Sequence, residues 1–276
     1  MTNNEYLESI ITKYTPHSEI YYQTALNNLQ NILNTWASTC SPSIVLSGSN
    51  AKDTAVSICS DIDYLISIAS TSKVGEDTSL KAIYNSLYET LEPHYSGKIR
   101  KQNVSIRVEL SSMLKTDLLE VDITPARRHD GCTNWHSLYL SKLDTWRQTN
   151  VRQHINDISN SGRNKEIKLL KIWRELNTLD FPSIYLEYLL VSNVLSYKPK
   201  SSDVLEILFG KSLANNFYHI LTKLASGEKN PLFDTITDPA NSGNILSDLL
   251  TNEEKNKIIK CAKISISKKN WKEIVF

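Results

Sequence analysis

Apolar residues recur every three or four positions in residues 19–36 and again in residues 78–91, and this spacing predicts two amphipathic helices. Between these segments, residues 44–46 and 62–66 are short apolar runs that favour strands of a buried sheet. The predicted order along this part of the chain is therefore helix, strand, strand, helix.

The next two apolar segments also predict strands. Residues 104–110 alternate strictly between apolar and polar side chains, and residues 118–123 form a second short run that stops before Pro125. A mixture of helices with strands of this kind is typical of an α+β fold, in which helices flank a mixed sheet.

The second half of the chain has helical spacing instead. Apolar residues fall on one face in residues 167–176 and again in residues 183–196. The stretch 156–164 contains Gly, Ser and Asn residues that are typical of a linker. We therefore predict an α+β lobe with N-terminal helices at residues 1–150 and a helical lobe at residues 151–276.

Composition and charge limit the classes of protein that fit. The 31 basic and 30 acidic residues give a net charge of +1, which excludes a surface that is basic all over. No apolar run approaches the roughly 20 residues that span a bilayer, so we expect a cytoplasmic protein with no membrane insertion. The four cysteines, at positions 40, 59, 132 and 261, form no CxxC pair and are expected to be reduced.

Two carboxylates stand on one face of a predicted strand. Asp61 and Asp63 are separated by one residue, and side chains alternate between the two faces along a strand. Neighbouring carboxylates repel each other unless a divalent cation lies between them, and Mg²⁺ prefers hard oxygen ligands. The pair therefore indicates a metal site, although solvated acids at a strand edge would give the same local pattern.

Two further features complete a candidate catalytic centre. Gly48 and Ser49 follow an apolar strand, where the backbone can approach a phosphate and its amides and the Ser49 hydroxyl can bond the oxygens. Asp122 lies between apolar residues of another predicted strand and supplies a third acid for two metal ions. Glu109 and Glu120 are alternative third acids by alternation, but the proline that follows the strand favours Asp122.

The order and spacing of these residues resemble a known superfamily. Gly48-Ser49, eleven intervening residues, Asp61-Ile62-Asp63-Tyr64 and later Val121-Asp122-Ile123 are similar to the polymerase-β-type nucleotidyltransferase pattern. Within that superfamily the chain most resembles the cGAS/DncV-like (CD-NTase), oligoadenylate synthetase and archaeal CCA-adding branch. The resemblance implies a palm-like lobe with a mixed sheet, followed by a helical lobe that binds the nucleotide.

Four stretches extend the resemblance to that branch, namely residues 121–126, 166–173, 181–187 and 238–244. The resemblance implies that Lys171 and Ser183 contact the triphosphate tail and that Tyr185 packs near the base. Asp53 departs from the family pattern, because many relatives have glycine there. An extra acid near the phosphates would reshape this loop or weaken triphosphate binding.

The resemblance also implies an activity. A metal-dependent nucleotidyltransferase moves a nucleoside monophosphate from an NTP or dNTP to a hydroxyl group and releases pyrophosphate. Asp61, Asp63 and Asp122 would bind two Mg²⁺ ions, with Mn²⁺ as an alternative, and the nucleotide would lie in a cleft between the lobes. Similarity to the cGAS/DncV-like branch suggests a cyclic or linear oligonucleotide signal in bacterial antiviral defence, sensed by a separate effector protein.

The motif leaves the acceptor open. A toxin-type enzyme that modifies tRNA 3′ ends or a protein hydroxyl has the same acids, and a catalytically silent nucleotide sensor or regulatory partner is an alternative of another class. Residues 141–178 hold eight basic and four acidic residues, an excess suited to phosphates or to an oligonucleotide or RNA acceptor. Within this segment, Lys168, Lys171 and Arg174 equally fit a solvated helix surface.

Three residues that follow the strand carrying Asp122 suggest a second metal site. His129, Cys132 and His136 have a spacing that zinc ligands can adopt. No fourth ligand follows nearby in the sequence, so an ordinary polar loop is the favoured interpretation and structural zinc is the alternative.

Overall fold

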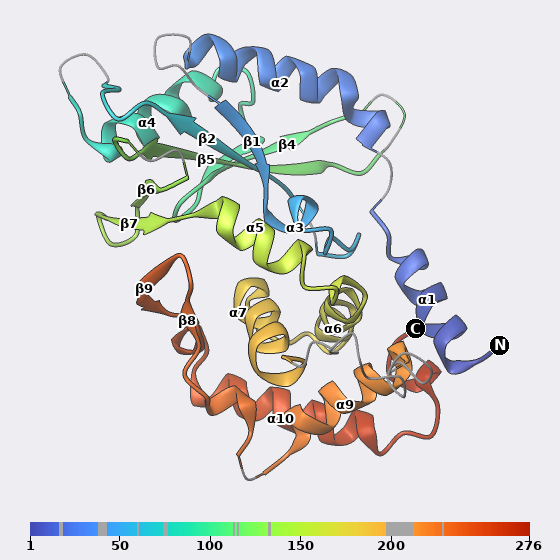
Figure 1. Ribbon diagram of the computed structural model, residues 1–276. Coiled ribbons are helices and arrows are strands. Elements are labelled where there is room, and N and C mark those ends of the chain that lie inside the picture. The colour runs from blue at the N-terminus through green and yellow to red at the C-terminus, as the bar shows by residue number, and fades with distance from the viewer. Residues whose placement is uncertain are drawn as a thin grey trace. The chain divides into compact units, whose positions relative to one another are not determined.

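The structure is a computed structural model in which the chain forms two compact units (Figure 1). It describes residues 1–16, 19–37, 43–59, 61–73, 77–112, 114, 116–131, 134–196, 212–227 and 229–276. The sheet unit comprises His17–Lys52 and Ser60–Asn156, and the helical unit comprises Met1–Pro16, Asp53–Cys59 and Asp157–Phe276. Two short pieces from the first part of the sequence thus belong to the helical unit.

The sheet unit is built on a mixed sheet. Its strands are β1 (Ser43–Ser47), β2 (Ile62–Ile68), β3 (Ile99–Lys101), β4 (Ile106–Leu110), β5 (Leu119–Arg128), β6 (His136–Leu140) and β7 (Thr145–Thr149). The strand order is β1-β2-β5-β4-β3, and β6 pairs with the far part of β5 and with β7. Among these pairs β2 and β5 run parallel, while the other pairs are antiparallel. The predicted α+β class is confirmed.

Two amphipathic helices, α2 (Gln23–Trp36) and α4 (Leu80–Leu91), contribute with the strands to one hydrophobic core. Both were predicted from apolar spacing, and the Ser79 hydroxyl caps α4 by accepting a hydrogen bond from the Ala82 amide. The even-numbered residues of β2 enter this core, and Figure 1 shows both helices on the same side of the sheet. Because strand side chains alternate, the odd-numbered residues of β2 lie on the opposite face.

Two short helices lie outside the core that α2 and α4 form with the sheet. The helix α3 (Gly48–Ala51) follows β1 directly. The helix α5 (Val151–Ser159) follows β7 and contributes side chains to a cavity on the face of the sheet that α2 and α4 leave open. The sheet thus has one face in the core and one face that can hold chemistry.

The helical unit contains α1 (Asn3–Lys13), α6 (Asn164–Leu176), α7 (Ser183–Tyr188), α9 (Leu213–Ala225) and α10 (Asn252–Ile266). A π-helical segment, η2 (Leu189–Val194), continues α7, and a hairpin of β8 (Thr237–Asp238) and β9 (Asn241–Ile245) precedes α10. Short 3-10 turns lie at η1 (Glu19–Tyr22), in the sheet unit, and at η3 (Pro231–Phe233), η4 (Leu246–Leu249) and η5 (Trp271–Glu273).

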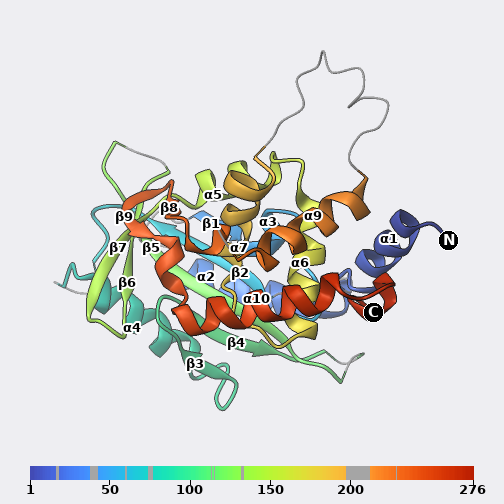
Figure 2. The same ribbon diagram turned by 90° about the horizontal axis from the view of Figure 1, so that it is seen from below.

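A second core holds the helical unit together. Trp173 of α6 is fully buried, and its indole nitrogen donates to the Ser265 hydroxyl of α10 at 2.9 Å. α9 packs along α10 (Figure 2), and a capping box of Thr251 and Glu254 begins α10. None of the helices in the described part of the chain combines the length and the hydropathy needed to cross a membrane.

Candidate active site

The turn after β1 contacts Asp63 and Asp61. Gly48 has a φ of +61°, a left-handed conformation that glycine adopts without strain. A Cβ at this position would overlap the carboxyl group of Asp63, so the side chain of Asp63 lies directly on the Gly48 backbone. The Asn50 side chain donates to the Asp61 carbonyl at 2.9 Å and ties the turn to the same strand. Ser49 lies in the first turn of α3.

Three charged residues form a row across neighbouring strands. Asp63 of β2 is the register neighbour of Asp122 in β5, and Asp122 is in turn opposite Arg107 in β4. These residues lie on the sheet face opposite the core. Asp61 immediately precedes β2, and Glu120 lies two residues before Asp122 on the same face. The structure therefore brings together the three acids that the sequence predicted.

Arg107 links the acids and was not predicted as a site residue. Its Nε donates to Asp122 Oδ1 at 2.7 Å and its Nη2 donates to Asp122 Oδ2 at 2.8 Å, in a two-pronged hydrogen bond. The same guanidinium also donates to Asp61 and to Glu120. Its side chain is only 14% exposed, so these hydrogen bonds are shielded from water. Strict alternation in residues 104–110 placed Arg107 on the polar face, but gave no partner.

The carboxylates are short of positive charge despite Arg107. Burial raises the pKa of Asp61 to about 6, with Arg107 lowering it and the carboxylates of Asp122 and Glu120 raising it further. Burial likewise raises the pKa of Asp63 to about 6, with contributions from Asp122 and Asp61 that Lys52 only partly offsets. Groups with such pKa values in one place are typical of functional sites.

The donor set fits a divalent cation in charge and chemistry. Four carboxylates lie around the Arg107 guanidinium, with Arg100 at 3.7 Å from Glu120 and Lys52 acting on Asp63 as further positive charges. Carboxylate oxygens are the ligands that Mg²⁺ prefers. Within the described residues, no three His, Cys, Asp or Glu side chains converge on a single point as metal ligands. The guanidinium of Arg107 holds Asp61 and Asp122 in this conformation and would compete with a cation for them.

Lys171 lies in the core of the helical unit. Its ammonium group donates to Glu187 Oε1 at 2.7 Å and to the Thr54 hydroxyl at 3.0 Å, and both charged side chains are at most 1% exposed. Thr54 also donates to Glu187 Oε1 at 3.0 Å. The contact of Lys171 with a triphosphate stays a prediction, while its ion pair with Glu187 is a structural feature of the unit.

The other residues of the predicted basic stripe also bind protein groups. Arg174 donates to the Phe181 carbonyl at 2.8 Å and to the Ser183 hydroxyl at 2.9 Å. Arg174 is only 7% exposed, so the interpretation of this stripe as a solvated helix surface is wrong. The basic side of α6 packs against other parts of the helical unit, as its apolar side does. The predicted contact of Ser183 with a triphosphate stays a prediction.

Tyr185 and Asp53 also belong to the helical unit. Tyr185 is fully buried, and its hydroxyl donates to the Leu232 carbonyl at 3.0 Å. Its position near a nucleotide base stays a prediction. Asp53 has a φ of 52°, the left-handed conformation that suits glycine, the residue expected from the family pattern. Its carboxylate pairs with Lys168 at 2.7 Å, which balances the extra negative charge locally.

The two histidines among the candidate zinc ligands form hydrogen bonds with serine hydroxyls. His129 Nε2 lies 2.9 Å from the Ser137 hydroxyl, and His136 Nε2 lies 2.8 Å from the Ser67 hydroxyl. Burial lowers the pKa of His136. Cys132 lies outside the described residues.

Comparison with known proteins identifies the fold. No protein-family model and no curated protein matches the chain. Among solved structures, CdnC of E. coli MS115-1 with ATP matches with a TM-score of 0.66 and 20% identity over 96% of this chain and 91% of that one. The CD-NTase CdnG of Bradyrhizobium diazoefficiens in complex with GTP matches with a TM-score of 0.69 and 12% identity over 99% and 95%.

A third solved structure belongs to a different group of enzymes. The Cid1 poly(U) polymerase bound to MgATP matches with a TM-score of 0.65 and 13% identity, covering 95% of this chain and 93% of that one. The chain therefore has the nucleotidyltransferase fold, and its architecture is similar to that of CD-NTases and of a poly(U) polymerase. This confirms the fold expected from the resemblance in the sequence.

Proposed function

We propose that this chain is a metal-dependent nucleotidyltransferase that transfers a nucleoside monophosphate from an NTP or dNTP to a hydroxyl group. The observation that supports the proposal most strongly is the row of acids on one sheet face, with Asp63 beside Asp122 and Asp61 next to β2. Because Gly48 has no side chain, the Asp63 carboxylate can lie against the turn after β1, which brings this acid beside a glycine turn of the kind that binds phosphates. The fold of nucleotide-bound CD-NTases supports the same reaction class.

Asp61, Asp63 and Asp122 would hold two divalent cations, either Mg²⁺ or Mn²⁺. When bound, these cations lower the pKa of the attacking hydroxyl and stabilise the charge of the departing pyrophosphate. The protein contributes position. Parallel pairing of β2 and β5 fixes Asp63 and Asp122 side by side, and Arg107 orients Asp122 through two hydrogen bonds. Such preorganisation of charged groups accounts for much of the rate in phosphoryl-transfer enzymes.

We further propose that the product is a cyclic or linear oligonucleotide made in the bacterial cytoplasm, used in antiviral defence and sensed by an effector protein. The similarity to two CD-NTases supports this choice. An RNA 3′ end is the second candidate acceptor, and the similarity to a poly(U) polymerase specifically favours it. All three acids are present, which argues against a catalytically silent sensor.

The test is incubation of the purified protein with each α-³²P-labelled NTP and dNTP, Mg²⁺ and a tRNA pool, followed by separation and mass measurement of the products. We expect label in small nucleotide products, and loss of at least about a hundredfold in rate for Asp61→Ala/Asp63→Ala. Label on RNA or on polypeptide would replace the signalling proposal with one of the alternatives. Nucleotide binding without any transfer would contradict the enzyme proposal itself.

A further inference from the structure

The open face of the sheet carries a row of charged side chains that crosses four neighbouring strands. Asp63 of β2 is the register neighbour of Asp122 in β5. Asp122 is opposite Arg107 in β4, and Arg107 is in turn opposite Arg100 in β3. Two acids at one end of the row therefore meet two arginines at the other. Like charges that lie directly opposite each other destabilise a sheet, so the two arginines need a compensating charge.

Glu120 supplies that charge to both arginines. It lies near the start of β5, on the same face of the strand as Asp122. Its Oε2 accepts a hydrogen bond from Arg107 Nη1, and its Oε1 lies 3.7 Å from Arg100 Nη2. Among the carboxylates that the structure describes, no other one forms an ion pair with Arg100. Glu120 is therefore the link between the two guanidinium groups.

The guanidinium of Arg107 is shared among three carboxylates. Nε and Nη2 donate to the two oxygens of Asp122, and Nη2 also donates to Asp61. Only the bond from Nη1 goes to Glu120. Because the guanidinium is a rigid planar fork, holding Nη1 also fixes the edge that faces Asp122. Without Glu120, the uncompensated charge of Arg107 would bind Asp61 and Asp122 more tightly.

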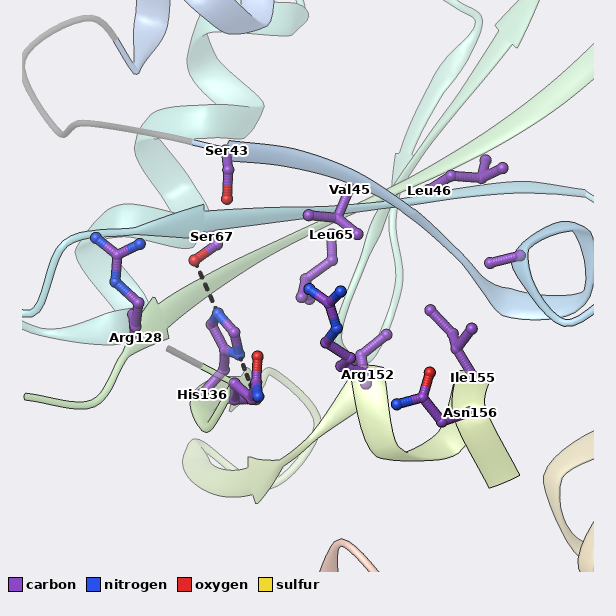
Figure 3. Close-up of a pocket in the computed structure, with 13 residues that line it drawn as sticks. Ser43, Val45, Leu46, Leu65, Ser67, Arg128, His136, Arg152, Ile155 and Asn156 are labelled. Atoms are coloured by element: carbon purple, nitrogen blue, oxygen red, sulfur yellow. Dashed lines mark hydrogen bonds between the residues drawn. The ribbon is translucent and has the colours of Figure 1, made fainter. Parts of the chain in front are cut away.

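This cluster is distinct from the cavity on the same face of the sheet. That cavity has a volume of about 510 Å³ and is lined on the sheet by residues that include Leu65, Ser67 and Arg128 (Figure 3). Arg128 is the last residue of β5, so at about 3.3 Å per residue Glu120 lies roughly 26 Å away along the strand. No residue of β3 or β4 is among the described residues that line the cavity. Glu120 therefore acts within the surroundings of the acids.

We propose that Glu120 is a positioning residue of the nucleotidyltransferase centre, which acts on Asp61 and Asp122 through the Arg107 guanidinium. It holds one edge of the guanidinium and offsets part of its charge, so that Arg107 orients Asp122 while both acids stay able to bind a divalent cation. The proposal rests on the proposed function, because it concerns the acids that would bind the cations. Direct binding of the cation by Glu120 is the alternative, and it would not require Arg107.

The test is Mn²⁺ binding to the whole protein without nucleotide, measured by electron paramagnetic resonance of the free ion. Glu120→Gln should weaken Mn²⁺ binding by at least about fivefold, because the unshared guanidinium competes more strongly for Asp61 and Asp122. In an Arg107→Met background, the same substitution should change the affinity by less than about twofold. Thermal melting of each variant checks that it is folded.

Glu109→Gln is the matched control. Glu109 is opposite Glu120 in the register of β4 with β5 and removes the same charge from the same face. In the described part of the chain it forms no hydrogen bond with Arg107, whose partners are Asp61, Glu120 and Asp122. Glu109→Gln should therefore leave the Mn²⁺ affinity within about twofold.

Rates of nucleotidyl transfer at saturating Mg²⁺ give a second readout. Glu120→Gln should lower kcat and leave KM for the nucleotide within about twofold, because Asp122 loses its orientation while the nucleotide keeps its contacts. Glu120→Asp keeps the charge and should recover part of the loss in kcat and in Mn²⁺ affinity. A general loss of structure would not give this combination.

Three results would overturn the proposal while the proposed function stands. The first is unchanged Mn²⁺ binding in Glu120→Gln, and the second is equal weakening by Glu109→Gln, which would indicate general surface charge. The third is a loss that is as large in the Arg107→Met background as in the parent, which would make Glu120 a direct ligand. A parent protein that neither binds Mn²⁺ nor transfers a nucleotide would contradict the proposed function, and this proposal would fall with it.

Discussion

Replacing Asp63 by Asn should stabilise the protein when no divalent cation is present. Asp63 is largely buried against Gly48 beside Asp122, and its pKa is raised from 3.8 to about 6. Between these two values the folded state holds a proton that the unfolded state has lost, so stability falls as pH rises from about 4 to about 6 and stays low above. Asparagine has nearly the same shape and carries no charge to bury.

The size of this effect follows from the shift in pKa. A shift of about two units corresponds to about 3 kcal/mol in the free energy of unfolding. Because asparagine must also leave polar atoms in the same place, we expect a gain of about 2 kcal/mol at pH 7.5, or a rise of roughly 4 °C in melting temperature. Near pH 3.5 the variant and the parent should melt at nearly the same temperature.

The assay is thermal melting of both proteins in EDTA from pH 3.5 to 8, repeated with Mg²⁺. The exposed residue Asp130 supplies a control, because Asp130→Asn removes one negative charge outside the site. Mg²⁺ should raise the melting temperature of the parent and of Asp130→Asn more than that of Asp63→Asn. A lower melting temperature for Asp63→Asn in EDTA at pH 7.5 would refute the argument that this carboxylate lacks positive charge.

Three other substitutions test the remaining contacts. Gly48→Ala should lower the free energy of unfolding by about 2–4 kcal/mol in urea titrations, through left-handed strain and overlap with Asp63, whereas Gly97→Ala, with a φ of +74° and no atoms within 4 Å, should lose only about 1 kcal/mol. Arg107→Met should destabilise the protein by about 3 kcal/mol in EDTA, because it leaves the Asp61 and Asp122 carboxylates without their guanidinium partner. It should also enlarge the rise in melting temperature that Mg²⁺ produces, because the guanidinium no longer competes with Mg²⁺ for these carboxylates. An unchanged Mg²⁺ effect would contradict this. Lys171→Met should cost about 3–5 kcal/mol, because it leaves the Glu187 carboxylate buried without its ammonium partner, and Lys171→Met/Glu187→Leu should recover much of that loss in a double-mutant cycle. If the double variant folds, its KM for NTP also tests the predicted triphosphate contact of Lys171.

Apolar spacing was sufficient to predict the elements that place the acids. It predicted α2, α4, β4 and the first part of β5, and alternation assigned Asp63 and Asp122 to faces that prove to be the same face of the sheet. The prediction that the strand stops before Pro125 was wrong, because β5 continues through this proline to Arg128 in parallel pairing with β2. The family-like order of motifs then grouped Asp122 with Asp61 and Asp63 in one centre. The positions of the acids follow from local periodicity and from a few motif residues, so they can be predicted from the sequence.

The remaining contacts depend on register and on long-range packing. Alternation puts Arg107 on the polar face, but only the antiparallel register of β4 with β5 places it opposite Asp122. Similarly, Lys171 falls on the polar side of α6 by spacing, and it is buried because Thr54 and Glu187 come from other segments. Neither the register nor the packing of residues 53–59 into the helical unit is encoded in a local pattern.

The central claim is that Asp61, Asp63 and Asp122 form the metal-dependent centre of a nucleotidyltransferase. Its most direct test is pyrophosphate release from a mixture of NTPs, measured with and without Mg²⁺ for the parent, Asp63→Asn, Asp122→Asn and Asp130→Asn. We predict Mg²⁺-dependent release by the parent and Asp130→Asn, and a loss of at least about a hundredfold for Asp63→Asn and Asp122→Asn. Pyrophosphate release that persists without a divalent cation, or that survives both substitutions, would contradict the claim.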